Sequence, residues 1–172
     1  PDRRMDIIPT DIIIHILSKY TENAFIFAHP YSYDKIIKYI TPQKICELAA
    51  RIGYLELLKY AIDHDCPLNP WAYASAALNG HLDCLKWLHD NCSSKCSWDY
   101  WTCTYAAYNG HLECLRYAHE KGCPWNEYTC IFAARNKQLE CYHFAKKNGC
   151  FAGHATMKIF KKHGMDECIH NI

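Results

Sequence analysis

The fold is decided by a stretch that occurs four times: AARIGYLELLKYA from Ala49, AALNGHLDCLKWL from Ala76, AAYNGHLECLRYA from Ala106 and AARNKQLECYHFA from Ala133. The starts are 27, 30 and 27 residues apart. Each copy has room for two short helices. A repeat of this kind is typical of a helical solenoid, in which each unit buries its apolar face by stacking on its neighbours. The sequence therefore predicts an all-α solenoid of about four to five short repeats with capping helices at both ends.

The ends of the predicted helices recur with the repeat. A short polar residue, which can accept hydrogen bonds from free backbone N–H groups, precedes three of the first helices: Asn69, Asp99 and Asn126. A glycine, which ends a helix without a Cβ penalty, follows the first helix in three copies: Gly53, Gly80 and Gly110. Apolar residues three and four apart, such as Leu82, Leu85 and Leu88, then predict a second helix with one buried stripe.

Composition and charge exclude several classes of function. The chain has 172 residues, of which 50% are hydrophobic and 22% are charged, and its formal net charge is +1. No strong field would attract nucleic acid or an anionic membrane. No apolar run reaches the roughly 18 residues of a membrane helix, and the N-terminus lacks the layout of a secretory signal. We expect a soluble protein of the cytoplasm or nucleus that binds neither nucleic acid nor membrane.

Twelve cysteines raise the question of a metal site. Ten of them fall into three columns of the repeat register: Cys46, Cys103 and Cys130; Cys84, Cys114 and Cys141; and Cys66, Cys96, Cys123 and Cys150. A cysteine that recurs inside stacked helices is typical of a small buried filler. Zinc needs four converging ligands, usually in pairs with short spacing, and no second pair accompanies Cys92 and Cys96. We therefore predict no metal and no cofactor, and keep a thiol or zinc redox protein as an alternative.

Catalytic residues do not stand out. The chain has eleven histidines, but His81 and His111 recur at one position of the repeat and His89 and His119 at another. A nucleophile and its base form one distinctive pair, which is the opposite of a residue repeated with the fold. No glycine-rich phosphate loop is present. The sequence predicts a protein that is not an enzyme.

The string NGHLECL, preceded by Ala-Ala in a helix–Gly–helix unit, resembles the ankyrin repeat. The resemblance covers about residues 45–153 and leaves residues 154–172 as a C-terminal capping helix. The usual Thr-Pro-Leu-His start of the first helix is absent. The period is also shorter than the usual 33 residues, so we expect a bare loop in place of the β-hairpin finger. Short units with a Gly-Cys-Pro-Trp loop are similar to those of large DNA viruses of amoebae, which implies a host protein as partner, in an infected host cell.

The resemblance also implies a binding surface. Ankyrin repeats bind proteins on a concave face built from the first helices, and six residues of this chain match that face: Trp71, Leu78, Trp101, Tyr108, Tyr128 and Arg135. Aromatic and arginine side chains are frequent hot spots of interfaces. Trp98 and Trp125, in the loops, are instead expected to pack against the neighbouring repeat.

Residues 1–44 lie outside the repeat and leave two interpretations open. The segment is a helical cap over the first repeat, which a solenoid end requires, or a degenerate F-box. The opening resembles the start of an F-box in six residues: Ile8, Pro9, Ile12, Ile13, Ile16 and Leu17. The F-box interpretation implies a Skp-type adaptor as a second partner.

The sequence thus predicts a non-enzymatic protein–protein interaction module. The main alternative is a substrate receptor of a cullin-type ubiquitin ligase.

Overall fold

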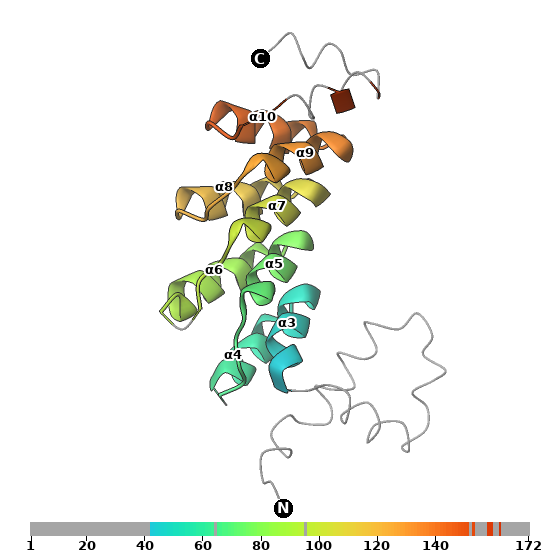
Figure 1. Ribbon diagram of the computed structural model, residues 1–172. Helices are drawn as coiled ribbons and strands as arrows, with labels where there is room; N and C mark the ends of the chain where they lie inside the picture. Colours follow the sequence, from blue (N-terminus) through green and yellow to red (C-terminus); the bar gives the residue numbers. More distant parts are fainter. Residues whose placement is uncertain are drawn as a thin grey trace, which may run out of the picture.

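The computed structural model describes residues 42–63, 65–94, 96–151, 153, 158–159 and 162. Eight helices lie in this part of the chain: α3 (Pro42–Ile52), α4 (Leu55–Asp63), α5 (Pro70–Leu78), α6 (Leu82–Cys92), α7 (Tyr100–Asn109), α8 (Leu112–Glu120), α9 (Glu127–Arg135) and α10 (Leu139–Lys147). They form four antiparallel pairs that stack in chain order (Figure 1). The predicted all-helical solenoid is confirmed.

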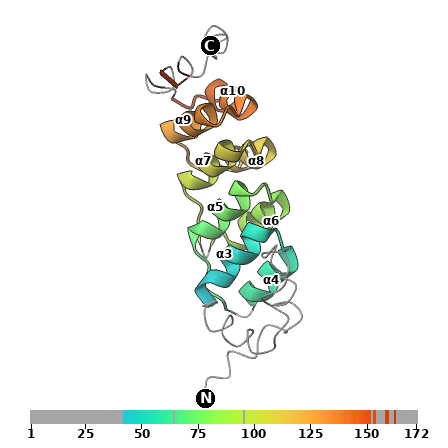
Figure 2. The same cartoon turned by 90° about the vertical axis from the view of Figure 1, so that its right-hand side faces the viewer.

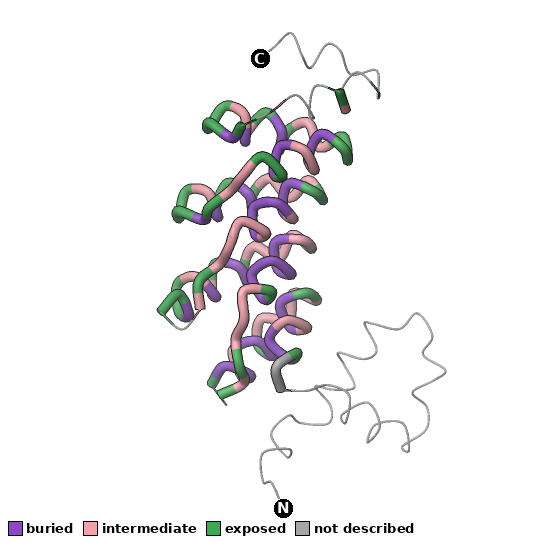
Figure 3. Tube along the Cα trace, viewed as in Figure 1, coloured by how far each residue is buried: buried purple, intermediate pink, exposed green. Residues whose placement is uncertain are grey.

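The stack has two layers. Helices α3, α5, α7 and α9 form one layer, and α4, α6, α8 and α10 form the other, as the two perpendicular views show (Figures 1 and 2). The first-layer helices contact one another closely, whereas neighbouring second-layer helices contact little. The purple, buried segments of Figure 3 follow the side on which the two layers meet.

The alanine pair lies where the layers meet. Ala76, Ala77, Ala106 and Ala107 are completely buried. A methyl side chain lets two helix backbones approach closely, and a larger side chain at the same place would force them apart. The repeat of Ala-Ala in the sequence therefore sets the close packing of the first layer.

The turn after each first helix has the predicted geometry. Gly53, Gly80 and Gly110 have φ angles of 73°, 74° and 78°, in the left-handed region. The next backbone N–H reaches back to the first alanine, as in the 2.9 Å bond from His81 to the Ala76 carbonyl. Lys137 adopts the same conformation in the fourth pair, with φ of 59°, so the turn survives there without glycine.

Two of the three predicted N-caps are confirmed. The Asp99 carboxylate accepts a hydrogen bond from the Trp101 N–H at 3.0 Å, and the Asn126 side chain accepts one from the Tyr128 N–H at 3.0 Å. Asn69 also occupies the N-cap position, but its side chain makes no capping bond and its buried Oδ1 has no hydrogen-bond partner.

The second helices and the loops follow the predicted pattern. Leu85 and Leu88 are fully buried, and Leu82 packs against the same core. Trp98 and Trp125 also pack against this core, where each stacks on a histidine of the preceding helix, His89 at 4.4 Å and His119 at 3.8 Å between ring centroids. The described residues contain no strand, so a bare loop stands where a β-hairpin finger would be.

Tyr73 is the exception in the column of Cys46, Cys103 and Cys130. Its hydroxyl donates to the carbonyl of Cys96 at 2.9 Å and lies 3.1 Å from the carbonyl oxygen of Leu88. Burial raises the pKa of this phenol, so it stays protonated as a donor. The larger side chain occurs in the same repeat as a three-residue insertion near Asn91–Lys95, which makes the second spacing 30 residues instead of 27. The tyrosine hydroxyl thus ties the longer loop to α5.

Some predictions fall on residues that the structure does not describe. The F-box-like residues Ile8, Pro9, Ile12, Ile13, Ile16 and Leu17 lie outside the described part, and so does most of the predicted capping helix at 154–172. The domain boundaries at 44 and 153 stay predictions. Among the described helices, none is long and apolar enough to span a membrane.

Candidate protein-binding surface

Three positions of each first helix, separated by four and three residues, share one helix face. They are Trp71, Ser75 and Leu78 on α5, then Trp101, Tyr105 and Tyr108 on α7, then Tyr128, Phe132 and Arg135 on α9. We call this set, without the buried Ser75, the aromatic surface. It contains all six residues predicted from the sequence.

The aromatic surface is open to solvent. Trp71, Tyr108 and Tyr128 are 48%, 38% and 45% exposed. They are three of the four large apolar side chains that are exposed in the described residues. Arg135 is exposed as well, whereas Leu78 and Trp101 are half-buried. A cluster of exposed rings is uncommon on a monomer and typical of an interaction site.

Ring contacts join the surface across the repeats. Tyr105 lies between two tryptophans, with centroids 5.3 Å from Trp101 and 6.1 Å from Trp71 on the neighbouring helix α5. In the same way, Phe132 lies 6.1 Å from Tyr128 and 5.8 Å from Tyr108 on α7. These contacts limit the freedom of the exposed rings before any partner binds.

Sequence reasoning missed Tyr105 and Phe132. Both directly precede the alanine pair, where Leu48 and Ser75 stand in the other copies. The signal was available, because each follows an aromatic residue at the helix start by four positions and so shares its face.

Side-chain amides form hydrogen bonds along the edge of the aromatic surface, where the first-layer helices end. The Asn109 amide donates to the Leu78 carbonyl of the preceding repeat at 2.6 Å, and the Asn136 amide donates to the Phe132 carbonyl at 3.0 Å. Arg135 and Lys137 are exposed at this edge. The charge at this corner of the surface is therefore positive.

The repeated histidines have structural contacts. The His81 Nε2 atom lies 3.1 Å from the Arg51 carbonyl oxygen. A Cβ added to Gly53 would lie 2.4 Å from the His81 ring, and one added to Gly80 would lie 2.6 Å from the His111 ring. Each ring thus covers the glycine of the preceding repeat. This contact explains the Gly-His step without any catalytic role.

The thiols do not form a metal centre in the described part of the chain, where no three His, Cys, Asp or Glu side chains come close enough to hold an ion. All eleven described cysteines are free. Burial raises the pKa of Cys84, Cys114 and Cys141 to about 11. These side chains are neutral thiols at neutral pH.

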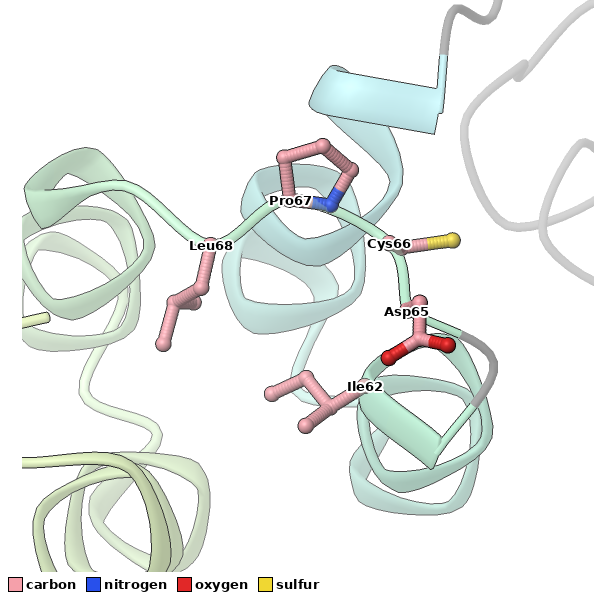
Figure 4. A pocket seen from close by; sticks show the side chains of 5 residues that line it. All are labelled: Ile62, Asp65, Cys66, Pro67 and Leu68. Carbon is pink, nitrogen blue, oxygen red and sulfur yellow. The ribbon is translucent and has the colours of Figure 1, made fainter. Parts of the chain in front are cut away.

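A hollow of about 240 Å³ lies beside the loop after α4, lined by Ile62, Asp65, Cys66, Pro67 and Leu68 (Figure 4). Ile62 and Leu68 occupy the positions that His89 and Trp98 fill in the next repeat. Smaller aliphatic side chains leave part of the space of the stacked rings empty. The hollow therefore reflects a packing difference between repeats.

The helix pairs and the Gly-His contact agree with a comparison to protein families. Residues 46–129 match the family model of ankyrin repeats, in three copies. The match runs from α3 into α9 and supports the ankyrin-repeat family for this solenoid. Ankyrin repeats are generally protein–protein interaction modules. No curated protein matches the sequence.

Proposed function

We propose that this ankyrin-like solenoid is a non-enzymatic interaction module that binds one protein partner on the aromatic surface. The observation that carries the proposal is the set of exposed rings on α5, α7 and α9, with ring contacts from α5 to α7 and from α7 to α9. The frame of alanines, glycines and leucines repeats, while these positions change from one helix to the next. Variation on a fixed frame is typical of a binding site carried by a scaffold.

The rings suit this role energetically. Tryptophan and tyrosine offer a large apolar area and few rotatable bonds, so little side-chain entropy is lost on binding. The contacts of Tyr105 and Phe132 with their neighbours hold the exposed rings in place in advance. The likeness to viral repeats suggests a host protein as the partner.

The test compares two variants of the whole chain. Capture from lysate with the wild-type protein identifies the partner, and calorimetry then measures its Kd. Trp71→Ala with Tyr108→Ala should weaken binding at least about tenfold, because hot-spot aromatic residues contribute most of the affinity. The matched control, Lys59→Ala with Lys86→Ala on the second-layer helices α4 and α6, should leave Kd unchanged. The proposal fails if the control weakens binding and the aromatic variant does not.

The ubiquitin-ligase hypothesis adds a second partner, a Skp-type adaptor bound through Ile8–Leu17. A chain that lacks residues 1–41 keeps all of α3 and separates the two roles. Adaptor recovered only with the whole chain would support the receptor. A partner retained equally by both chains, with no adaptor, would support the simple binding module.

A further inference from the structure

Two pairs of cysteines have the same arrangement in successive repeats, and the first repeat shares their helix-to-loop bond, from the Cys46 thiol to the Cys66 carbonyl at 3.9 Å. Cys103 of α7 and Cys130 of α9 lie 20 residues before Cys123 and Cys150, in the loops that follow α8 and α10. The helix thiol donates to the carbonyl of its loop cysteine, at 4.0 Å for Cys103 and 3.8 Å for Cys130.

The loop thiols turn back to the helix start. Cys123 donates to the Asp99 carbonyl at 3.3 Å, and Cys150 donates to the Asn126 carbonyl at 3.2 Å. All four side chains are at most 4% exposed. Each loop is thus fixed to the first helix of its own repeat by two hydrogen bonds from thiols to backbone carbonyls.

The sulfurs of the second pair differ in acidity. A side-chain hydrogen bond between Cys130 and Cys150 lowers the pKa of Cys150; burial raises this pKa, and Lys146 lowers it further. The same hydrogen bond raises the pKa of Cys130, together with burial. Two cysteines in hydrogen-bond contact can be joined by oxidation, with one sulfur as the nucleophile and the other as the resolving partner.

We propose that Cys130 and Cys150 are a modification site, a dithiol that a peroxide oxidises to a disulfide within the fourth repeat. Cys150 gives up its proton, its sulfur attacks one oxygen of hydrogen peroxide, the O–O bond breaks, and the departing hydroxide takes that proton to become water. Cys150 is then a sulfenic acid. The Cys130 sulfur attacks it, the S–S bond forms, and the hydroxide that leaves combines with the Cys130 proton as a second water. Two thiols are oxidised by two electrons and one peroxide is reduced.

The oxidant must be small to reach the two sulfurs, because both side chains are almost completely buried. Hydrogen peroxide is comparable to water in size, and Cys150 retains 4% of its surface. The second repeat provides an internal comparison. There Tyr73 replaces the helix cysteine and bonds the Cys96 carbonyl, so no disulfide can join these two positions.

The experiment uses the full chain. The folded protein is treated with limiting hydrogen peroxide, its remaining thiols are alkylated in denaturant, and it is digested with trypsin without reduction. Cleavage after Arg135 and Lys147 places Cys130 and Cys150 in separate peptides, and fragmentation of the linked pair distinguishes Cys130 from Cys123, which lies in the same peptide. We expect these two peptides to be linked, with the loss of two hydrogens. A rise of about 5 °C in Tm, reversed by a reducing agent, should accompany the link because it closes a loop in the unfolded chain.

Two variants complete the test. Cys150→Ala should abolish the link and the rise in Tm, and Cys84→Ala, which removes a buried thiol elsewhere, should change neither. Cys130→Ala replaces Cys150→Ala if the latter does not fold. The proposal is overturned if Cys130 and Cys150 remain alkylated while other cysteines oxidise, or if the linked peptide forms only in denaturant. The outcome is independent of the binding experiment, since neither cysteine belongs to the aromatic surface.

Discussion

The two helix layers are built from the same repeat but differ in how their helices pack and in what they expose. First-layer helices meet through buried alanine pairs, whereas second-layer helices hardly touch their neighbours and hold the core through leucines such as Leu85 and Leu115. The outer faces differ as well. The first layer exposes rings, and the second exposes charged side chains such as Glu56 and Glu113. Contacts between repeats therefore belong mostly to the first layer, and so does the proposed binding surface.

The largest loss of stability is expected at the glycine turn that ends the first-layer helices. In Gly80→Ala, the new methyl group would lie 2.6 Å from the His111 ring at a φ angle of +74°. Left-handed strain and the displaced ring together should lower the free energy of unfolding by about 3 kcal/mol. Urea denaturation followed by circular dichroism measures this change.

Gly122→Ala is the matched control. Its φ angle is +81°, but nothing lies within 4 Å of the added Cβ. Only the conformational strain remains, which is about 1 to 2 kcal/mol. Equal losses in the two variants would show that the His111 contact adds nothing to the stacking of the repeats.

The second layer can be probed through its thiols. Burial raises the pKa of Cys84 to about 11, above the ordinary value of 9.0. Between these values the unfolded chain has lost the proton that the folded chain keeps, so stability falls as the pH rises. The expected slope is about 1.4 kcal/mol per pH unit for each such thiol.

Urea denaturation at several pH values from 9 to 11 gives this slope. Cys84→Ala should reduce the slope of the free energy of unfolding against pH by the contribution of one thiol, about 1.4 kcal/mol per pH unit. An identical slope in both proteins would contradict the assigned burial effect.

The smallest effect is expected on the outer face of the second layer. Lys59 and Glu56 form an ion pair at 2.8 Å, but the Glu56 side chain is 72% exposed. Exposed pairs one helical turn apart contribute about 0.3 kcal/mol. Lys59→Ala should therefore shift the urea midpoint very little, and a loss above about 1 kcal/mol would mean that this face contributes to stacking.

The sequence predicted the frame of the fold and most of the surface for a physical reason. Residues such as Gly80 and Ala76 recur in successive repeats, because these repeats need the same backbone conformation or the same close packing at that position. The aromatic surface was largely predicted because its positions follow the same register. Tyr105 and Phe132 were missed because they have no counterpart in the first two repeats, Leu48 and Ser75 standing in their place.

Contacts specific to one repeat could not be predicted. The buried Asn69 Oδ1, which has no hydrogen-bond partner, differs from the capping side chains of Asp99 and Asn126 at the same position. The hydrogen bond of Tyr73 to the longer loop depends on how the insertion folds. The Thr104 and Thr129 hydroxyls, 3.2 Å apart, join two repeats where the usual Thr-Pro-Leu-His start is absent, and only the packing of α7 on α9 brings them together.

The contact of each histidine with the preceding glycine also bears on how such a chain can change in length. Gly53 meets His81, and Gly80 meets His111, with the same geometry. Removal of residues 77–106 would fuse Ala76 to Ala107 and bring His111 into the place of His81, above Gly53. A duplication of one repeat would likewise recreate both halves of the contact. Growth and shortening by whole units thus need no compensating substitution at this junction, and the span of the aromatic surface could change with the number of units.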